Sequence, residues 1–137
     1  MNHKKIEFEK LPITKYYGKS IYNVWHVVED GKAIVLTNFK LLGISDQKRI
    51  KSIIGSMATI PGFENYSLRW RVHKYQYGEV KPKGHRFFFF IKYRENIVFF
   101  YYRRKKSDSL GDKTYREIDR KRKKYEKEFE KFIEGNK

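Results

Sequence analysis

The sequence predicts an α+β fold in which an antiparallel, twisted sheet packs with two helices. The strand-like segments form two groups, an N-terminal hairpin and a later three-strand meander, and a segment with helical periodicity follows each group. A chain of 137 residues suits a single domain. Within it we expect an N-terminal β extension (1–43), a core (44–129), and a helix end with a tail (130–137).

The N-terminal group of strand-like segments contains a dipeptide that is typical of a tight turn. An alternating segment, Lys4–Lys10, predicts the first strand. Two more segments, Ile21–Glu29 and Lys32–Phe39, flank Asp30-Gly31. This dipeptide suits a type I′ turn because both central residues tolerate positive φ. The pattern therefore predicts a β-hairpin.

The first helix is expected after Ser45 or Asp46, either of which can serve as its N-cap. Apolar residues recur at i, i+3, i+4 and i+7 from Ile50 to Met57, which gives one buried stripe. Pro61-Gly62 then ends the helix.

The meander combines one two-sided strand with two apolar ones. Leu68–His73 alternates apolar residues with Arg or His, whereas Arg86–Tyr93 and Ile97–Arg103 are apolar on both faces. Such strands are either central and covered on both sides, or lined on one side by functional aromatics. A long helix is expected at Asp112–Glu134, where interleaved acids and bases indicate a solvated structural face.

Charge is the strongest functional signal. The chain has 32 Lys and Arg against 16 Asp and Glu, a net charge of +16, together with 24 aromatic residues (2 Trp, 11 Tyr and 11 Phe). Basic groups neutralise phosphates and aromatic rings stack on bases, so we expect a nucleic-acid partner. A structural reading stays open, in which the aromatic residues form the core and lysines supply solubility.

The positive charge is concentrated in the meander. Between Tyr66 and Lys106 there are twelve basic residues and two acidic ones, Glu79 and Glu95, which gives this segment a net charge of +10. A protein that covers this patch should be acidic, since unpaired cations are costly to bury.

The sequence lacks the residue patterns of metal sites, signal peptides and membrane spans. The sequence has no cysteine, and its four histidines lack zinc-ligand spacing, so we expect no metal and no cofactor. The N-terminus has no apolar signal core, and no apolar run is long enough to span a membrane. We therefore expect a cytoplasmic protein without a membrane partner.

Three stretches resemble one family. Tyr77–Phe90 (YGEVKPKGHRFFFF), Ile97–Lys106 (IVFFYYRRKK) and Thr114–Phe129 (TYREIDRKRKKYEKEF) are similar to the RelE/HigB toxins of type II toxin–antitoxin systems. In that family a strand ending near "yGElR" leads through a basic loop to a strand that starts with Arg, and a later strand ends in a "KK" turn before a helix.

The resemblance implies a fold like that of the microbial ribonucleases and a specific activity. These toxins cleave messenger RNA, generally on the ribosome, without a metal, and an antitoxin protein neutralises them. The expected partners are therefore RNA, in a ribosomal context, and an acidic antitoxin.

Metal-free RNA cleavage needs a base for the 2′-hydroxyl, a cation for the charge on phosphorus, and an acid for the leaving oxygen. Arg86 is the expected phosphate clamp, because it begins a strand where the family places a catalytic Arg. Glu79 or His85 could be the base. Arg103 and Lys105 follow a strand end and could protonate or stabilise the leaving group.

Further residues could bind RNA without taking part in the chemistry. The expected set is Lys81, Lys83, Arg69, Arg71, Arg104, Lys106 and Tyr115. For Tyr115, the helical spacing to Ile118 favours packing in the core, and for the lysines simple solubility is the alternative.

Two other functions remain open at this level. A non-catalytic RNA- or DNA-binding module could use the same basic, aromatic sheet face, and a related gyrase-poisoning toxin would share the fold and bind protein. The glycine–aromatic signature of an RNA-recognition motif is missing from Arg86–Phe90.

Overall fold

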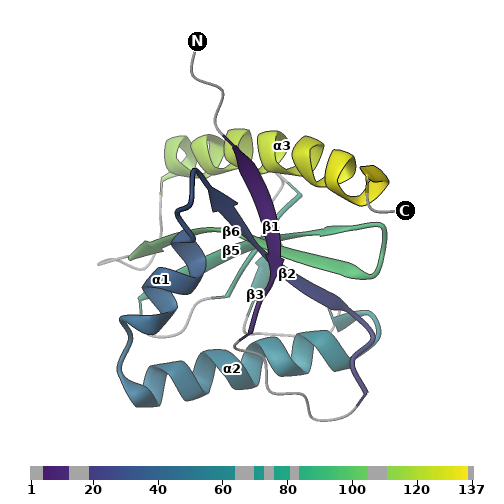
Figure 1. Cartoon of the computed structure of the whole chain (residues 1–137). Helices are drawn as coiled ribbons and strands as arrows, with labels where there is room; N and C mark the ends of the chain where they lie inside the picture. Colours follow the sequence, from purple (N-terminus) through teal and green to yellow (C-terminus); the bar gives the residue numbers. More distant parts are fainter. Residues whose placement is uncertain are drawn as a thin grey trace.

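A computed structural model of the chain describes residues 5–12, 19–63, 70–72, 76–80, 84–104 and 111–135, and at 70–72 only the backbone. Figure 1 shows a central sheet with helices on both sides. In chain order the elements are β1 (Ile6–Lys10), β2 (Asn23–Glu29), α1 (Ile34–Lys40), α2 (Ile44–Thr59), β3 (Trp70–Val72), β4 (Gly78–Val80), β5 (His85–Lys92), β6 (Asn96–Arg104) and α3 (Asp112–Gly135).

The sheet is mixed and open, with the strand order β1-β2-β6-β5-β4-β3. Four neighbouring pairs are antiparallel, but β2 and β6 run parallel, with Asn23 opposite Asn96 and His26 opposite Phe99. The α+β class is therefore confirmed, whereas the purely antiparallel sheet is wrong. No local pattern indicates the parallel pairing, because it joins segments more than seventy residues apart.

The hairpin around Asp30-Gly31 is also wrong, although its turn is present. Both residues have positive φ (52° and 77°), and Glu29 and Lys32 exchange backbone hydrogen bonds of 2.9 Å. After this one pair the chain enters α1 instead of a strand, and β2 pairs with β1. In α1, Val35 and Phe39 are buried four residues apart, so packing as a helix overrides the β propensity of this segment.

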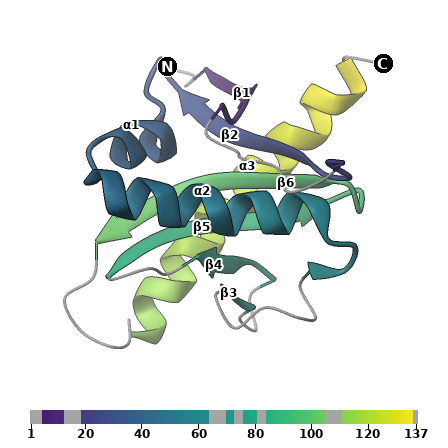
Figure 2. The ribbon, with the colours of Figure 1, turned by 90° about the horizontal axis from the view of Figure 1, so that it is seen from below.

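Three helices rather than two cover the sheet. Side chains from α1 and α2 form one core with Phe87, Phe89 and Phe99, whereas α3 forms a second core with Phe88 and Phe90. Figure 2 shows α2 crossing one face of the sheet and α3 lying behind it. The double-sided apolar character of β5 and β6 thus reflects burial on both faces, one of the two expected alternatives.

The meander has four strands, because β4 lies between β3 and β5. β4 is only three residues long, too short for alternation to show in the sequence. In the β5–β6 ladder the register shifts between Phe88 and Phe89, opposite Tyr101 and Phe99 respectively, which leaves Phe100 as the bulged residue.

The predicted stripe of α2 is confirmed, since Ile50, Ile53, Ile54 and Met57 are all buried. Its N-cap is Gly43 rather than Ser45 or Asp46, because the helix starts at Ile44. The side chain of Asp46 is therefore not used as a cap and faces β5, where it lies near His85.

The long helix α3 is confirmed and is attached to the sheet at both of its ends. The Tyr77 hydroxyl donates to the Tyr115 backbone oxygen at 2.9 Å, and Lys92 Nζ lies 2.7 Å from Glu130 and 3.2 Å from Glu126. Ion pairs along the helix, including Arg122 with Glu126, match the expected spacing. Within the described ranges, no helix has the length and apolar character needed to cross a membrane.

Gly78 generates a prediction about stability. A Cβ atom built at Gly78 would lie 2.5 Å from the Phe89 ring, which is fully buried and sits opposite it in the β4–β5 ladder. Gly78→Ala should therefore lower the free energy of unfolding by about 1–3 kcal/mol, measured by urea denaturation. Gly135→Ala, where a Cβ meets open space, is the control and should change stability by less than about 1 kcal/mol. Equal stability of the two variants would contradict the close packing at Gly78.

Candidate phosphate-binding site at the end of β5 and β6

Two cross-strand pairs at one end of the β5–β6 ladder bring basic residues together. His85 lies opposite Arg104, and Arg86 lies opposite Arg103. We call these four residues the basic end of the sheet. Like charges directly opposite one another destabilise an antiparallel pair, so the Arg86–Arg103 pair costs stability unless an anion balances it.

Arg86 and Glu79 lie together on the face of the sheet that α3 covers. Glu79 sits opposite Phe88, and Arg86 is two residues before Phe88, so all three point to the same side. Arg86 Nε lies 4.0 Å from Glu79 Oε2, and both side chains are buried. Arg86 Nε donates no hydrogen bond to any residue the structure describes, and NH1 makes only a long one, 3.4 Å, to the His85 backbone oxygen. The guanidinium is therefore held by charge and packing more than by hydrogen bonds.

His85 lies on the opposite face, toward α2. Its Nδ1 is 2.8 Å from the Tyr102 hydroxyl, and its Nε2 is 3.9 Å from Asp46 Oδ2. Burial lowers the pKa of His85, and the positive charges of Arg104 and Arg86 lower it further, while Asp46 raises it. The imidazole is thus held in its neutral form and can accept a proton.

The sheet therefore divides the expected catalytic residues. Arg86, Glu79 and Arg103 share the α3 face, while His85 packs on the α2 face with Tyr102 and Asp46. Glu79 is 1% exposed, so it can orient Arg86 but does not reach a substrate in this conformation. Arg103 and Arg104 are exposed and are the cations that a phosphate can meet first.

Tyr115 belongs to the core. It is 9% exposed, it packs in the cluster beneath α3, and its backbone oxygen accepts the bond from Tyr77. The packing alternative is confirmed for this residue. The backbone of Arg71 pairs with Glu79 in the β3–β4 ladder, which puts β3 beside the Arg86–Glu79 pair.

Several expected site residues lie outside the described residues. They are Arg69, Lys81, Lys83, Lys105 and Lys106. All five flank β3, β4, β5 or β6 in the sequence, so Lys105 remains a prediction for the leaving-group step and the other four remain predictions for RNA binding.

Sequence reasoning missed Asp46 and Tyr102 as neighbours of His85. Asp46 was interpreted as a helix cap, and Tyr102 was one of many aromatics in an apolar strand. Strand alternation could have placed His85 and Tyr102 on one face, but the approach of α2 has no signal in the sequence. Among the described residues, no group of three or more His, Asp or Glu side chains is arranged to hold a metal ion.

Comparison of the chain with protein-family models, curated proteins and solved structures gives no match. The site must therefore be interpreted from its own chemistry. Arg86 and Arg103, on one face of the ladder end, can bind a phosphodiester and neutralise the charge that develops on it, whereas His85, which can accept a proton, lies with Arg104 on the other face.

The environment of His85 generates a prediction about pKa. Followed by NMR, His85 should titrate below its ordinary pKa of 6.5, because burial and two arginines disfavour the cation. Asp46→Asn should lower the pKa of His85 further, since it removes the one negative charge that favours protonation. A pKa of 6.5 or above, or one unchanged by Asp46→Asn, would contradict this environment.

The same shift has a consequence for stability. The unfolded chain takes up a proton at His85 near pH 6.5, whereas the folded chain resists it. The contribution of neutral His85 to the free energy of unfolding is therefore fully present above pH 6.5 and is lost as the pH falls through and below that value. Buried His26, whose pKa burial also lowers, acts in the same direction.

Proposed function

We propose that the protein is a metal-independent endoribonuclease that acts on messenger RNA, as the toxin of a type II toxin–antitoxin system of the RelE/HigB kind. The observation that carries the proposal is the Arg86–Arg103 pair, two like charges directly opposite in a ladder. Such a pair is costly without an anion, and among the described residues Arg86 has an acid beside it, Glu79 at 4.0 Å, whereas Arg103 forms no ion pair. A phosphodiester between the two guanidinium groups would offset that cost.

In the proposed reaction the RNA 2′-oxygen attacks the adjacent phosphorus and loses its proton. The bond from phosphorus to the 5′-oxygen breaks, and that oxygen gains a proton. The products are a 2′,3′-cyclic phosphate and a 5′-hydroxyl. Arg103, and Arg86 behind it, stabilise the charge that develops on the phosphoryl oxygens.

The supporting residues have distinct parts in this proposal. Buried Glu79 positions the Arg86 guanidinium from 4.0 Å, and the proposed proton acceptor is neutral His85, which precedes Arg86 in β5 and lies on the other face of the sheet. The +10 charge of the surrounding segment attracts the RNA strand. An acidic antitoxin would cover the same surface by charge complementarity.

A non-catalytic RNA- or DNA-binding module is the second candidate, and one observation favours it. Arg86 is 9% exposed and lies on the face that α3 covers, so a ligand meets Arg103 and Arg104 first. In that case the basic end would bind phosphates without cleaving them.

Arg103 provides the sharper mutational test. Arg86→Ala would remove the cation that lies 4.0 Å from buried Glu79 and is expected to destabilise the fold. A loss of cleavage in that variant would therefore not distinguish a catalytic role from a structural one. Arg103 is exposed, and Arg103→Ala should lower the rate of mRNA cleavage in a translating extract by about 10²-fold at an unchanged melting temperature.

Lys127→Ala is the matched control, because Lys127 is an exposed cation on α3 next to Glu126, which pairs with Lys92 at the other end of the β5–β6 ladder. It should cleave at the wild-type rate. Product ends give a second readout: a 2′,3′-cyclic phosphate agrees with the mechanism, whereas a 3′-hydroxyl end contradicts it. Binding of RNA without any cleavage by the wild type would establish the second candidate.

Salt dependence tests the binding step that both candidates share. Each phosphate neutralised by Lys or Arg releases counterions, so several contacts make affinity fall steeply with ionic strength. We expect RNA affinity to fall by at least about 10²-fold between 50 and 200 mM salt, measured by fluorescence anisotropy. A nearly constant affinity would contradict a phosphate-binding surface at the basic end.

A further inference from the structure

A second site lies where the two parallel strands separate. β2 and β6 are paired only from Asn23 to His26 and from Asn96 to Phe99. After β2 the chain forms α1, which packs on one face, and after β6 it forms α3, which packs on the other. Crevices outside the carboxyl ends of adjacent parallel strands, where the connections leave to opposite faces, are the usual ligand sites of open sheets.

A groove of about 700 Å³ occupies this position. One wall comes from the end of β2, the Asp30-Gly31 turn and α1, and the other comes from Tyr101 of β6 and two residues of α3, Lys121 and Tyr125. This volume falls within the range of small-molecule binding sites. We call it the α1–α3 groove.

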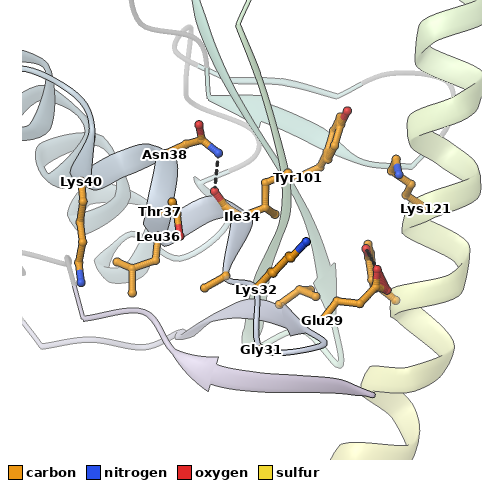
Figure 3. Close-up of a pocket in the computed structure, with 13 residues that line it drawn as sticks. Glu29, Gly31, Lys32, Ile34, Leu36, Thr37, Asn38, Lys40, Tyr101 and Lys121 are labelled. Atoms are coloured by element: carbon orange, nitrogen blue, oxygen red, sulfur yellow. Dashed lines mark hydrogen bonds between the residues drawn. The ribbon is translucent and has the colours of Figure 1, made fainter. Parts of the chain in front are cut away.

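Cations face one another across the groove. Figure 3 shows Lys32 and Lys121 extending toward the same space from opposite walls, with Lys40 farther along α1. Neither Lys32 nor Lys121 has a carboxylate partner among the described residues. The acid in the wall, Glu29, is already engaged, by Lys124 Nζ at 3.0 Å and the Tyr125 hydroxyl at 3.4 Å. The groove therefore favours an anion.

The rest of the lining suits a planar group. Tyr101 is half-buried, and Lys121 Nζ lies 5.1 Å from the centre of its ring. Ile34 and Leu36 add apolar surface from α1. The Asn38 amide nitrogen donates to the Ile34 backbone oxygen at 2.8 Å, and Figure 3 shows the side-chain oxygen of Asn38 pointing away from that bond. Lysines for an anion, a flat surface and a side-chain amide together match the phosphate and the base of a nucleotide.

The groove is also continuous with the basic end. Tyr101 lies opposite Phe88 and Arg103 opposite Arg86, so both side chains point to the α3 face of β6. Two residues along a strand span about 6.5 Å. A strand of RNA bound at Arg103 would thus place a neighbouring nucleotide at the mouth of the groove.

We propose that the α1–α3 groove binds one nucleotide of the RNA, with its phosphate between Lys32 and Lys121 and its base against Ile34 and Asn38, which lie on the same side of α1. That the nucleotide belongs to RNA held at Arg103 rests on the proposed function. Binding of a nucleotide as such rests only on the groove.

The first experiment measures binding of a nucleoside 5′-monophosphate by calorimetry, with inorganic phosphate and the unphosphorylated nucleoside as separate probes. The nucleotide should bind about tenfold or more tightly than either fragment, because it uses both the cations and the flat wall. Lys32→Ala and Lys121→Ala should each weaken nucleotide binding about tenfold. Lys127→Ala, an exposed lysine of the same helix outside the groove, should not. Equal affinity for phosphate and nucleotide, or equal effects of the three substitutions, would overturn the proposal.

The second experiment separates this inference from the proposed function. In RNA cleavage, Lys32→Ala combined with Lys121→Ala should raise KM about tenfold or more and leave kcat unchanged, whereas Arg103→Ala lowers kcat. Unchanged KM in the double variant would overturn the groove as an RNA subsite while cleavage by the wild type stands. If the wild type cleaves no RNA, the proposed function fails, and nucleotide binding that depends on Lys32 and Lys121 still supports the groove.

Discussion

The apolar character of both faces of the β5–β6 pair is the constraint on which the rest of the structure depends. Every residue from Phe87 to Phe90 and from Ile97 to Phe100 is nearly inaccessible to water. A sheet of this kind cannot leave either face in solvent, so helices must cover both. α1 and α2 form one cover and α3 forms the other, and β2 and β4 then pair with the outer edges.

The same constraint explains where the charge lies. Since the middle of β5 and β6 is closed by packing, polar chemistry is restricted to the ends of these strands. There His85, Arg86, Arg103 and Arg104 end the ladder, and two of the three arginines face each other. At the other end, Lys92 pairs with Glu126 and Glu130 of α3. The hydrogen bonds to these two acids raise the pKa of Lys92, although burial lowers it, so the lysine keeps its charge. One end of the ladder is thus a completed structural contact, whereas at the other end Arg86 lies beside Glu79 and the exposed Arg103 and Arg104 form no ion pair with a described residue.

The two proposed sites follow from how the helices cover the sheet. Because α1 and α3 leave neighbouring parallel strands toward opposite faces, their near ends stay apart and leave the α1–α3 groove open. β6 connects the two sites, with Tyr101 at the groove and Arg103 at the basic end. Phe100 points toward α3, and strict alternation would turn Tyr101 and Arg103 to the other face. Because Phe100 is a bulged residue, Tyr101 and Arg103 also face α3, and the two proposed sites lie on the same side of the sheet.

Sequence alone determined the elements whose signal is local. The helical stripes of α2 and α3 and the positive-φ turn at Asp30-Gly31 depend on residues within one segment, so periodicity and composition were sufficient to predict them. For β5 and β6 the sequence showed that both faces are apolar, but it left open whether both are buried or one is lined by functional aromatics. The concentration of positive charge also came from the sequence, and the choice of Arg86 came from the family resemblance. Whether that arginine acts on a phosphate remains a prediction.

Tertiary structure decided everything that depends on distant partners. The parallel β2–β6 pairing, the helical state of Ile34–Lys40 and the three-residue strand β4 are set by packing between segments far apart in the chain, for which local propensity has no signal. The same holds for the sites. Only the fold places Asp46 and Tyr102 beside His85, separates His85 from Arg86 and Glu79 by the thickness of the sheet, and brings Lys32 to face Lys121. Strand alternation fixes which side a residue faces, but the contact it makes there depends on which helix covers that side.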